Sequence, residues 1–181
     1  MTSSDTFDFT HDGRDFRASI YPDENRGAPW TDECGHGPVR RIRSRDEKHP
    51  GEVILGDGPD RHTYGFAYDV QAAQRIALRD GWGFEGADLA VMTKRQIAAE
   101  AVQRDIKRLE GWARGDWFYV GVAVQALDDE GEPEGGPYDH AVWGIESDCR
   151  DYLREVAQEL AGEVLADEAR KAHASATVGE C

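Results

Sequence analysis

The residues in this sequence that could do chemistry are mostly carboxylates, and five of them recur at one spacing. Asp151, Glu155, Glu159, Glu163 and Asp167 each follow the previous one by four residues. Side chains at positions i and i+4 are neighbours on a helix surface, so these five are predicted to form one slanting row, which we call the acidic ridge. Such a row of carboxylates can bind the Lys and Arg side chains of a partner protein.

A second group of carboxylates, which we call the loop acids, stands among glycines and prolines in one short segment. Its members are Asp128, Asp129, Glu130, Glu132, Glu134 and Asp139. A loop of this kind suggests calcium, but the EF-hand pattern needs Gly at its sixth position, where this chain has Pro133. We therefore assign the loop acids, together with Asp148, to the same predicted interaction surface as the acidic ridge.

Cys34 and His36 are the one place where a thiol and an imidazole lie close together in the sequence. They could supply a nucleophile with its base, or two ligands of a metal ion. The adjacent acids, Asp32 and Glu33, disfavour a thiolate, and the spacing matches no zinc signature. Cys34 and His36 therefore form an alternative metal or catalytic site, while the leading prediction has no catalytic residue, metal or cofactor.

The segment from Gly81 to Gly86 matches the letters of the dinucleotide-binding motif GxGxxG. That motif must follow a strand and must not repel a pyrophosphate. Here it follows a predicted helix and contains Glu85. The glycines are therefore predicted to end a helix and open a loop.

The elements that position the acids are predicted from hydrophobic periodicity. Alternating valines at 120, 122 and 124 predict a strand over 117–127, which pairs with a strand over 141–145 across the loop acids. Apolar residues at 153, 156, 160 and 164 predict a helix over 149–172 that carries the acidic ridge. Residues 173–181 are predicted to be a flexible tail.

The rest of the chain is predicted to complete a single α+β domain over residues 1–172. A hairpin turns at residues 11–13, a loop covers 22–38, and short strands cover 39–43, 52–55 and 63–64. Helices are predicted over 66–80, ending at Gly81, and over 93–109, with Thr93 as the N-cap. This order predicts an antiparallel sheet with about three helices packed on it.

The net charge of the chain is −15, from 36 acidic and 21 basic residues. This excess argues against direct binding to nucleic acid or to an anionic membrane. The charge is also local, because residues 116–168 hold 15 acids and two bases, whereas residues 1–115 carry a net charge of only −3. Four like-charge pairs along the acidic ridge cost a helix about 1–2 kcal/mol. A local rule that is broken without visible compensation predicts a functional surface.

The sequence also predicts where the protein acts. The N-terminus has no apolar run typical of a signal peptide, and the longest apolar stretch, within 118–127, is too short to span a bilayer. The three cysteines are odd in number and widely spaced, so they form no disulfide framework. A cytoplasmic location is therefore predicted.

Two further features have both structural and functional interpretations. The basic cluster Arg40, Arg41, Arg43, Arg45 and Lys48 is predicted to pair with acids of the same chain. Trp30, in a loop rich in Gly and Pro, is predicted to be an exposed partner contact.

Four segments resemble an uncharacterised family of phage and prophage proteins, and the resemblance covers about residues 21–161. The segments are Gly27-Ala28-Pro29-Trp30, Gly35-His36-Gly37-Pro38-Val39, Arg79-Asp80-Gly81-Trp82-Gly83 and Trp143-Gly144-Ile145-Glu146-Ser147-Asp148. By composition, the chain is also similar to small acidic anti-CRISPR and anti-restriction proteins. Several of those present carboxylates where a host nuclease expects nucleic acid, in the manner of a DNA mimic.

The leading hypothesis is therefore a phage-encoded, non-enzymatic inhibitor of a bacterial defence complex. It would act in the cytoplasm of the infected or lysogenic host and would bind a basic, nucleic-acid-binding surface through the acidic ridge and the loop acids. One alternative is a phage accessory module that binds a protein through the loop around Trp30, in which case the acids only keep the protein soluble. The other is the Cys34–His36 site.

Overall fold

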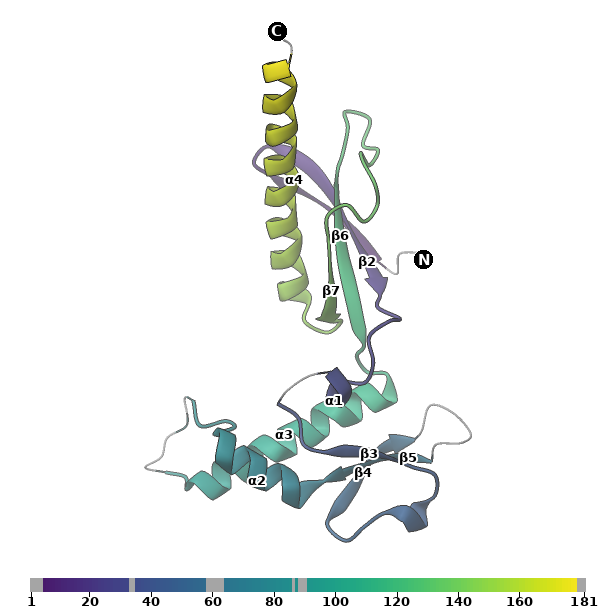
Figure 1. Ribbon diagram of the computed structural model, residues 1–181, viewed down its shortest axis with the longest axis vertical. Coiled ribbons are helices and arrows are strands. Elements are labelled where there is room, and N and C mark those ends of the chain that lie inside the picture. The colour runs from purple at the N-terminus through teal and green to yellow at the C-terminus, as the bar shows by residue number, and fades with distance from the viewer. Residues whose placement is uncertain (1–4, 33–34, 58–63, 86, 88–90, 179–181) are drawn as a thin grey trace. The chain divides into compact units, whose positions relative to one another are not determined.

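The computed structural model describes residues 5–32, 35–57, 64–85, 87 and 91–178. It confirms the α+β class, with antiparallel sheets and helices along the same chain (Figure 1). The contacts divide the chain into two compact units: unit 1 is Met1–Arg26 with Phe118–Cys181, and unit 2 is Gly27–Trp117. The strands form two sheets, one in each unit, instead of one. One domain over 1–172 stays a prediction, and each unit is described by itself.

Unit 1 is a four-stranded antiparallel sheet with one long helix on a face. The strands are β1 (Asp5–His11), β2 (Arg14–Pro22), β6 (Tyr119–Ala126) and β7 (Ala141–Glu146), and the helix is α4 (Arg150–Val178). Their order in the sheet is β1-β2-β6-β7. Asp12 and Gly13 join β1 to β2 with φ angles of 48° and 81°, the left-handed pair that a two-residue hairpin requires.

The core of unit 1 lies between the sheet and α4 (Figure 1). Phe16 of β2 and Val122 of β6 are fully buried there against Leu160 of α4. The predicted stripe on the last helix is confirmed, because Leu153, Val156, Leu160 and Val164 are all buried. The predicted pairing of the 117–127 and 141–145 strands is also confirmed by the β6–β7 ladder.

Unit 2 has a three-stranded antiparallel sheet in the order β3-β5-β4, with two longer helices. Its elements are α1 (Pro29–Asp32), β3 (Val39–Ile42), η1 (Arg45–Glu47), β4 (Glu52–Asp57), β5 (Gly65–Asp69), α2 (Val70–Asp80) and α3 (Lys94–Arg114). Gly81 ends α2 in a left-handed conformation, as predicted. Thr93 caps α3 and forms a capping box with Gln96.

Three sequence predictions need correction. The helix predicted over 66–80 begins only at Val70, because Gly65–Asp69 forms β5, the central and mostly buried strand of its sheet. Burial on both faces gives a strand a continuous apolar run, which periodicity does not distinguish from a helix. The helix predicted to end at residue 172 continues as far as Val178. The predicted strand at 63–64 is not found at Tyr64, and Thr63 lies outside the described residues.

Candidate functional site

The negative charge of the chain belongs almost entirely to unit 1. Its residues include 21 acids and 7 bases, a net charge of −14, whereas unit 2 has 15 acids and 14 bases, a net charge of −1. The structural boundary therefore separates the charges more sharply than the division at residue 115 that the sequence suggested. The excess of acids over bases therefore lies on unit 1.

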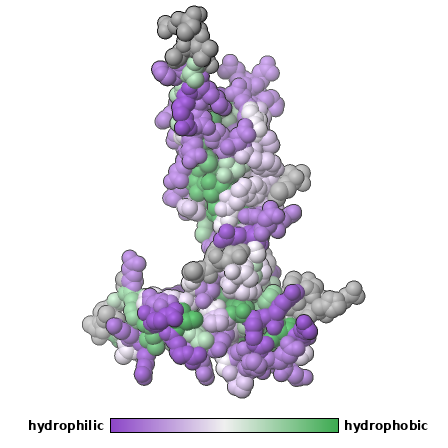
Figure 2. All heavy atoms as spheres, in the orientation of Figure 1, coloured by the Kyte–Doolittle hydropathy of each residue, from purple (hydrophilic) through white to green (hydrophobic). Residues whose placement is uncertain are grey.

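The acidic ridge lies on α4, as predicted, and most of it is exposed. Asp151, Glu155, Glu159 and Glu163 are exposed, while the residues of α4 between them that face the sheet are buried. Within the part of the chain that the structure describes, these four side chains make no ion pair and no hydrogen bond. Figure 2 shows hydrophilic residues over the visible surface of the C-terminal half of α4.

The fifth member of the ridge differs from the others. The Asp167 side chain is 33% exposed and pairs with Arg170 one turn later on α4. His140, at the end of the loop before β7, places its Nε2 atom 3.7 Å from Oδ2 of Asp167. Asp167 is therefore engaged within unit 1, and the unpaired ridge consists of Asp151, Glu155, Glu159 and Glu163.

Half of the loop acids hold the loop in shape. Asp128 accepts the backbone N–H groups of Glu130 and Glu132, both at 2.9 Å. Asp139 accepts the N–H of Gly136, also at 2.9 Å. Glu134 forms an ion pair with Arg14. Asp129 and Glu130 are exposed, with no side-chain hydrogen bond or ion pair to a described residue. Glu132 is also exposed, and its charge interacts with that of Arg17 on β2.

Arg14 connects the loop acids to α4. Its guanidinium pairs with Glu134 in the loop and with Glu168 on α4, so the base of the loop is held beside the C-terminal half of the helix. Glu134, Asp139, His140, Asp167 and Glu168 also line one shared pocket there. The structure thus brings the loop acids and the end of the acidic ridge together, although they are far apart in sequence.

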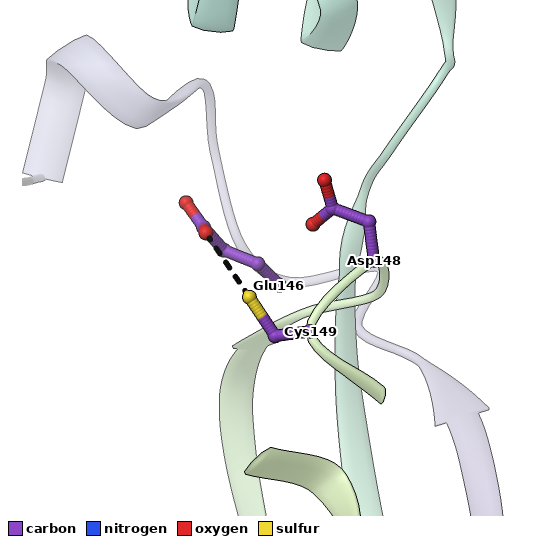
Figure 3. A group of neighbouring side chains, drawn as sticks. All are labelled: Glu146, Asp148 and Cys149. Atoms are coloured by element: carbon purple, nitrogen blue, oxygen red, sulfur yellow. Dashed lines mark hydrogen bonds between the residues drawn. The ribbon is translucent and has the colours of Figure 1, made fainter. Parts of the chain in front are cut away.

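Asp148 lies in the turn between β7 and α4, next to two groups that the sequence analysis did not combine with it. Glu146, Asp148 and Cys149 place one potential metal-ligating atom each within 4.8 Å of one another (Figure 3). The Cys149 thiol donates to Oε2 of Glu146 at 3.8 Å. A thiolate and two carboxylates suit a metal such as zinc, which takes both kinds of ligand. Asp148 and Cys149 are exposed in the turn, while Glu146, the last residue of β7, is half-buried.

The alternative site is only partly described, because Cys34 lies outside the described residues. His36 places its Nδ1 atom 2.6 Å from Oδ1 of Asp105 on α3. Asp105 also accepts the N–H of Gly37 and the hydroxyl of Tyr68, so it fixes the loop before β3 against the helix. Among the described residues, His36 belongs to no group of three potential metal ligands. Sequence reasoning missed Asp105 and Tyr68, which no local pattern connects with His36.

Trp30 packs inside unit 2. It is half-buried, with its ring 4.9 Å from that of Phe66 and 5.1 Å from that of Trp112. These ring contacts make Trp30 part of the core of unit 2. A contact between Trp30 and a partner stays a prediction.

The predicted pairing of the basic cluster with internal acids is confirmed for Arg40. Its guanidinium donates two hydrogen bonds of 2.8 Å to the carboxylate of Glu52, whose side chain is only 7% exposed. The Arg40 guanidinium is the main reason that the pKa of Glu52 is lowered, and the N–H of His49 at 2.7 Å adds to the effect. Glu52 is thereby held ionised inside unit 2.

Comparison of the chain with protein-family models, with curated proteins and with solved structures finds no match. The resemblance to a phage family therefore stays a prediction. Among the described helices, none combines the length and the apolar character needed to cross a membrane. The site itself must therefore carry any functional conclusion.

Proposed function

We propose that this protein is a non-enzymatic binding protein that docks unit 1 on a basic, nucleic-acid-binding surface of another protein. The observation that carries this proposal is the unpaired acidic ridge. Asp151, Glu155, Glu159 and Glu163 are exposed at successive i,i+4 positions, and no described cation neutralises them. An ordinary solvent-facing helix would place Lys or Arg between such acids and gain stability from the pairs.

The physical benefit of such a ridge is realised on binding. A protein surface rich in Lys and Arg would replace the repulsion along α4 by attraction, and the field of a unit with a net charge of −14 would steer its approach. This kind of complementarity raises association rates and selects partners more than it sets affinity. A nucleic-acid-binding surface offers such a complement, because it carries the Lys and Arg that neutralise phosphates.

The spacing of the carboxylates favours an overall charge match over a copy of the phosphate backbone. Ridge residues recur about every 6 Å along the helix axis, whereas one DNA strand carries a phosphate about every 3.4 Å. Asp129, Glu130 and Glu132 add carboxylates on the same unit, and Arg14 holds their loop against α4. The ridge and these loop acids together are the proposed contact surface.

The proposed biological setting follows from the resemblance of the sequence to phage proteins. The protein would act in the cytoplasm of an infected or lysogenic bacterium, as an inhibitor of the anti-CRISPR or anti-restriction type. Its partner would be a host defence protein, with no direct contact to nucleic acid or membrane. No cofactor is part of the proposal.

The test is affinity capture from a host lysate at low and high salt, with identification of the bound proteins. The ridge variant changes Glu155, Glu159 and Glu163 to Lys. The matched control changes Glu24, Glu85 and Glu100 to Lys, which are exposed and lie off α4. Each triple variant moves the net charge from −15 to −9, so only the position of the change differs.

We expect the wild type and the control to capture a nucleic-acid-binding protein at low salt and to lose it at high salt. The ridge variant, shown to be folded by circular dichroism, should capture none of it. Equal capture by the ridge variant would refute the proposal. Equal loss in both variants would show that net charge alone, and not the ridge, is responsible.

A further inference from the structure

Unit 1 contains a cavity of about 180 Å³, open to solvent on one side, between its sheet and the first turns of α4. Phe7 of β1, Ile20 of β2 and Leu153 of α4 contribute apolar parts of its wall. For comparison, an apolar cavity of about 150 Å³ in a protein core holds a benzene molecule. The space therefore suits an aromatic ring or a short branched chain.

Two arginines line the same cavity. Arg150 and Arg154 are the only basic residues between positions 116 and 168, and unit 1 offers them 21 acids as partners. Yet neither makes an ion pair or a hydrogen bond with any side chain that the structure describes. Arg14 and Arg17 of the same unit, by contrast, each pair with a carboxylate. Arg150 and Arg154 are exposed, so their guanidinium donors remain available at the surface of an anionic unit.

The positions of the two guanidinium groups favour an anion in the cavity. The Cζ atom of Arg154 lies 5.4 Å from the centroid of the Phe7 ring, a cation–π contact that holds the charge at the cavity wall. Arg150 is the first residue of α4, where the helix dipole disfavours a cation. The hydroxyl of Ser147, another lining residue, accepts the N–H of Phe118 at 3.0 Å, so its own proton can be donated to a ligand.

We propose that this cavity binds a small organic carboxylate that carries an apolar group, of about the size of benzoate. The planar fork of Arg matches a carboxylate in two parallel hydrogen bonds, and the apolar wall takes the hydrocarbon part. Inorganic phosphate would satisfy the arginines but leave the half-buried Phe7 and Ile20 in contact with water. The one acid in the lining, Asp5, accepts the N–H of Thr6 at 3.0 Å and would repel the ligand. This proposal is independent of the acidic ridge.

The experiment is a calorimetric titration of the full chain at low salt with benzoate as the probe. Benzyl alcohol, which lacks the charge, and inorganic phosphate, which lacks the ring, are titrated in parallel. We expect saturable binding of benzoate, with both comparison compounds at least about tenfold weaker. Absence of saturable benzoate binding would overturn the proposal, and tighter binding of phosphate would overturn the ligand class.

Variants locate the site. Arg150→Gln combined with Arg154→Gln should weaken benzoate binding by about tenfold or more, since each charge-assisted hydrogen bond is lost. Arg170→Gln, on the same helix but paired with Asp167, should leave it unchanged. Asp5→Asn should tighten binding by removing the repulsion. Unchanged binding in the folded double variant would show that benzoate lies elsewhere and would refute the site.

Discussion

The hydroxyl of Tyr68 on β5 donates a hydrogen bond of 2.6 Å to Oδ2 of Asp105 on α3. Tyr68 is fully buried, and the Asp105 side chain is only 8% exposed. The same carboxylate lies 2.6 Å from Nδ1 of His36 and accepts the N–H of Gly37 at 2.8 Å. One buried acid thus joins the sheet, the helix and the loop before β3 of unit 2.

Removing the Tyr68 hydroxyl should destabilise the protein. Tyr68→Phe takes one donor from a buried carboxylate, and we expect the free energy of unfolding to fall by about 1–3 kcal/mol. Tyr64→Phe, at an exposed tyrosine of the same unit, should change it by less than about 0.5 kcal/mol. Urea unfolding followed by fluorescence measures both. Equal stability of the two variants would contradict a structural role for the bond.

Tyr68 should also make the fold sensitive to alkali. Burial is the largest cause that raises the pKa of Tyr68 above its ordinary value of 10.0, and the bond to Asp105 adds to it. A raised pKa gives stability that is fully present below the unfolded pKa and is lost as the pH rises through the folded one. The stability difference between wild type and Tyr68→Phe should therefore shrink above pH ~10. If the stability difference between the wild type and Tyr68→Phe stays constant across that pH range, it does not arise from the raised pKa of Tyr68.

Glu52 should make unit 2 sensitive to acid. Its pKa lies below the ordinary value of 4.5, mainly because Arg40 donates two hydrogen bonds to it. The stability from a lowered pKa is present above the unfolded value and is lost as the pH falls through the folded one. Glu52→Gln should therefore destabilise the protein at neutral pH, and by progressively less below pH ~4.5.

Thermal unfolding of the wild type and the Glu52→Gln variant across this pH range provides the measurement. Glu100→Gln, at an exposed position on α3, is the matched control and should follow the wild type. If the stability lost in Glu52→Gln does not depend on pH, then packing, and not the ionisation of Glu52, is responsible for the loss.

Neutralising the acidic ridge should stabilise the protein while removing its proposed function. Changing Glu155, Glu159 and Glu163 to Gln removes all four like-charge pairs along α4, and we expect a gain of about 1–2 kcal/mol at low salt. The gain should shrink at high salt, where the exposed charges are screened. Urea unfolding at two salt concentrations measures the free energy of unfolding. Urea is used because guanidinium is itself a salt and would screen the charges. A loss of stability would show that the ridge has stabilising partners.

Gly121 and Trp143 should depend on each other. A Cβ at Gly121 of β6 would clash with the Trp143 ring on β7, so Gly121→Ala forces the ring away at a cost of about 1–3 kcal/mol. Adding Trp143→Ala should recover part of that cost, which a double-mutant cycle measures. Gly162→Ala on α4, whose Cβ would lie 3.7 Å from His11, should instead stabilise by about 0.5–1 kcal/mol. If the stability changes of Gly121→Ala and Trp143→Ala simply add in the double variant, the close approach of the two residues would be contradicted.

Several features of this protein follow from sequence alone, because they depend on neighbours within a few residues. The Asp12–Gly13 turn, the N-cap at Thr93 and the end of α2 at Gly81 are local backbone requirements. The apolar stripe of α4 and the acidic ridge both follow from the helical period. Local charge counts even indicated that the acids gather near the C-terminus.

Tertiary structure decided the rest, because pairing between distant residues has no local signal. Only the fold brings Arg14 to Glu134 and Glu168, and thereby separates the acids that have an internal partner from those without a described one. Only the fold makes Gly65–Asp69 a central strand and places Asp105 beside His36. It also turns Arg150 and Arg154, which the sequence presented merely as the two bases in an acidic segment, toward a common cavity. Composition sets the number of charges, whereas long-range packing decides which of them remain available to bind.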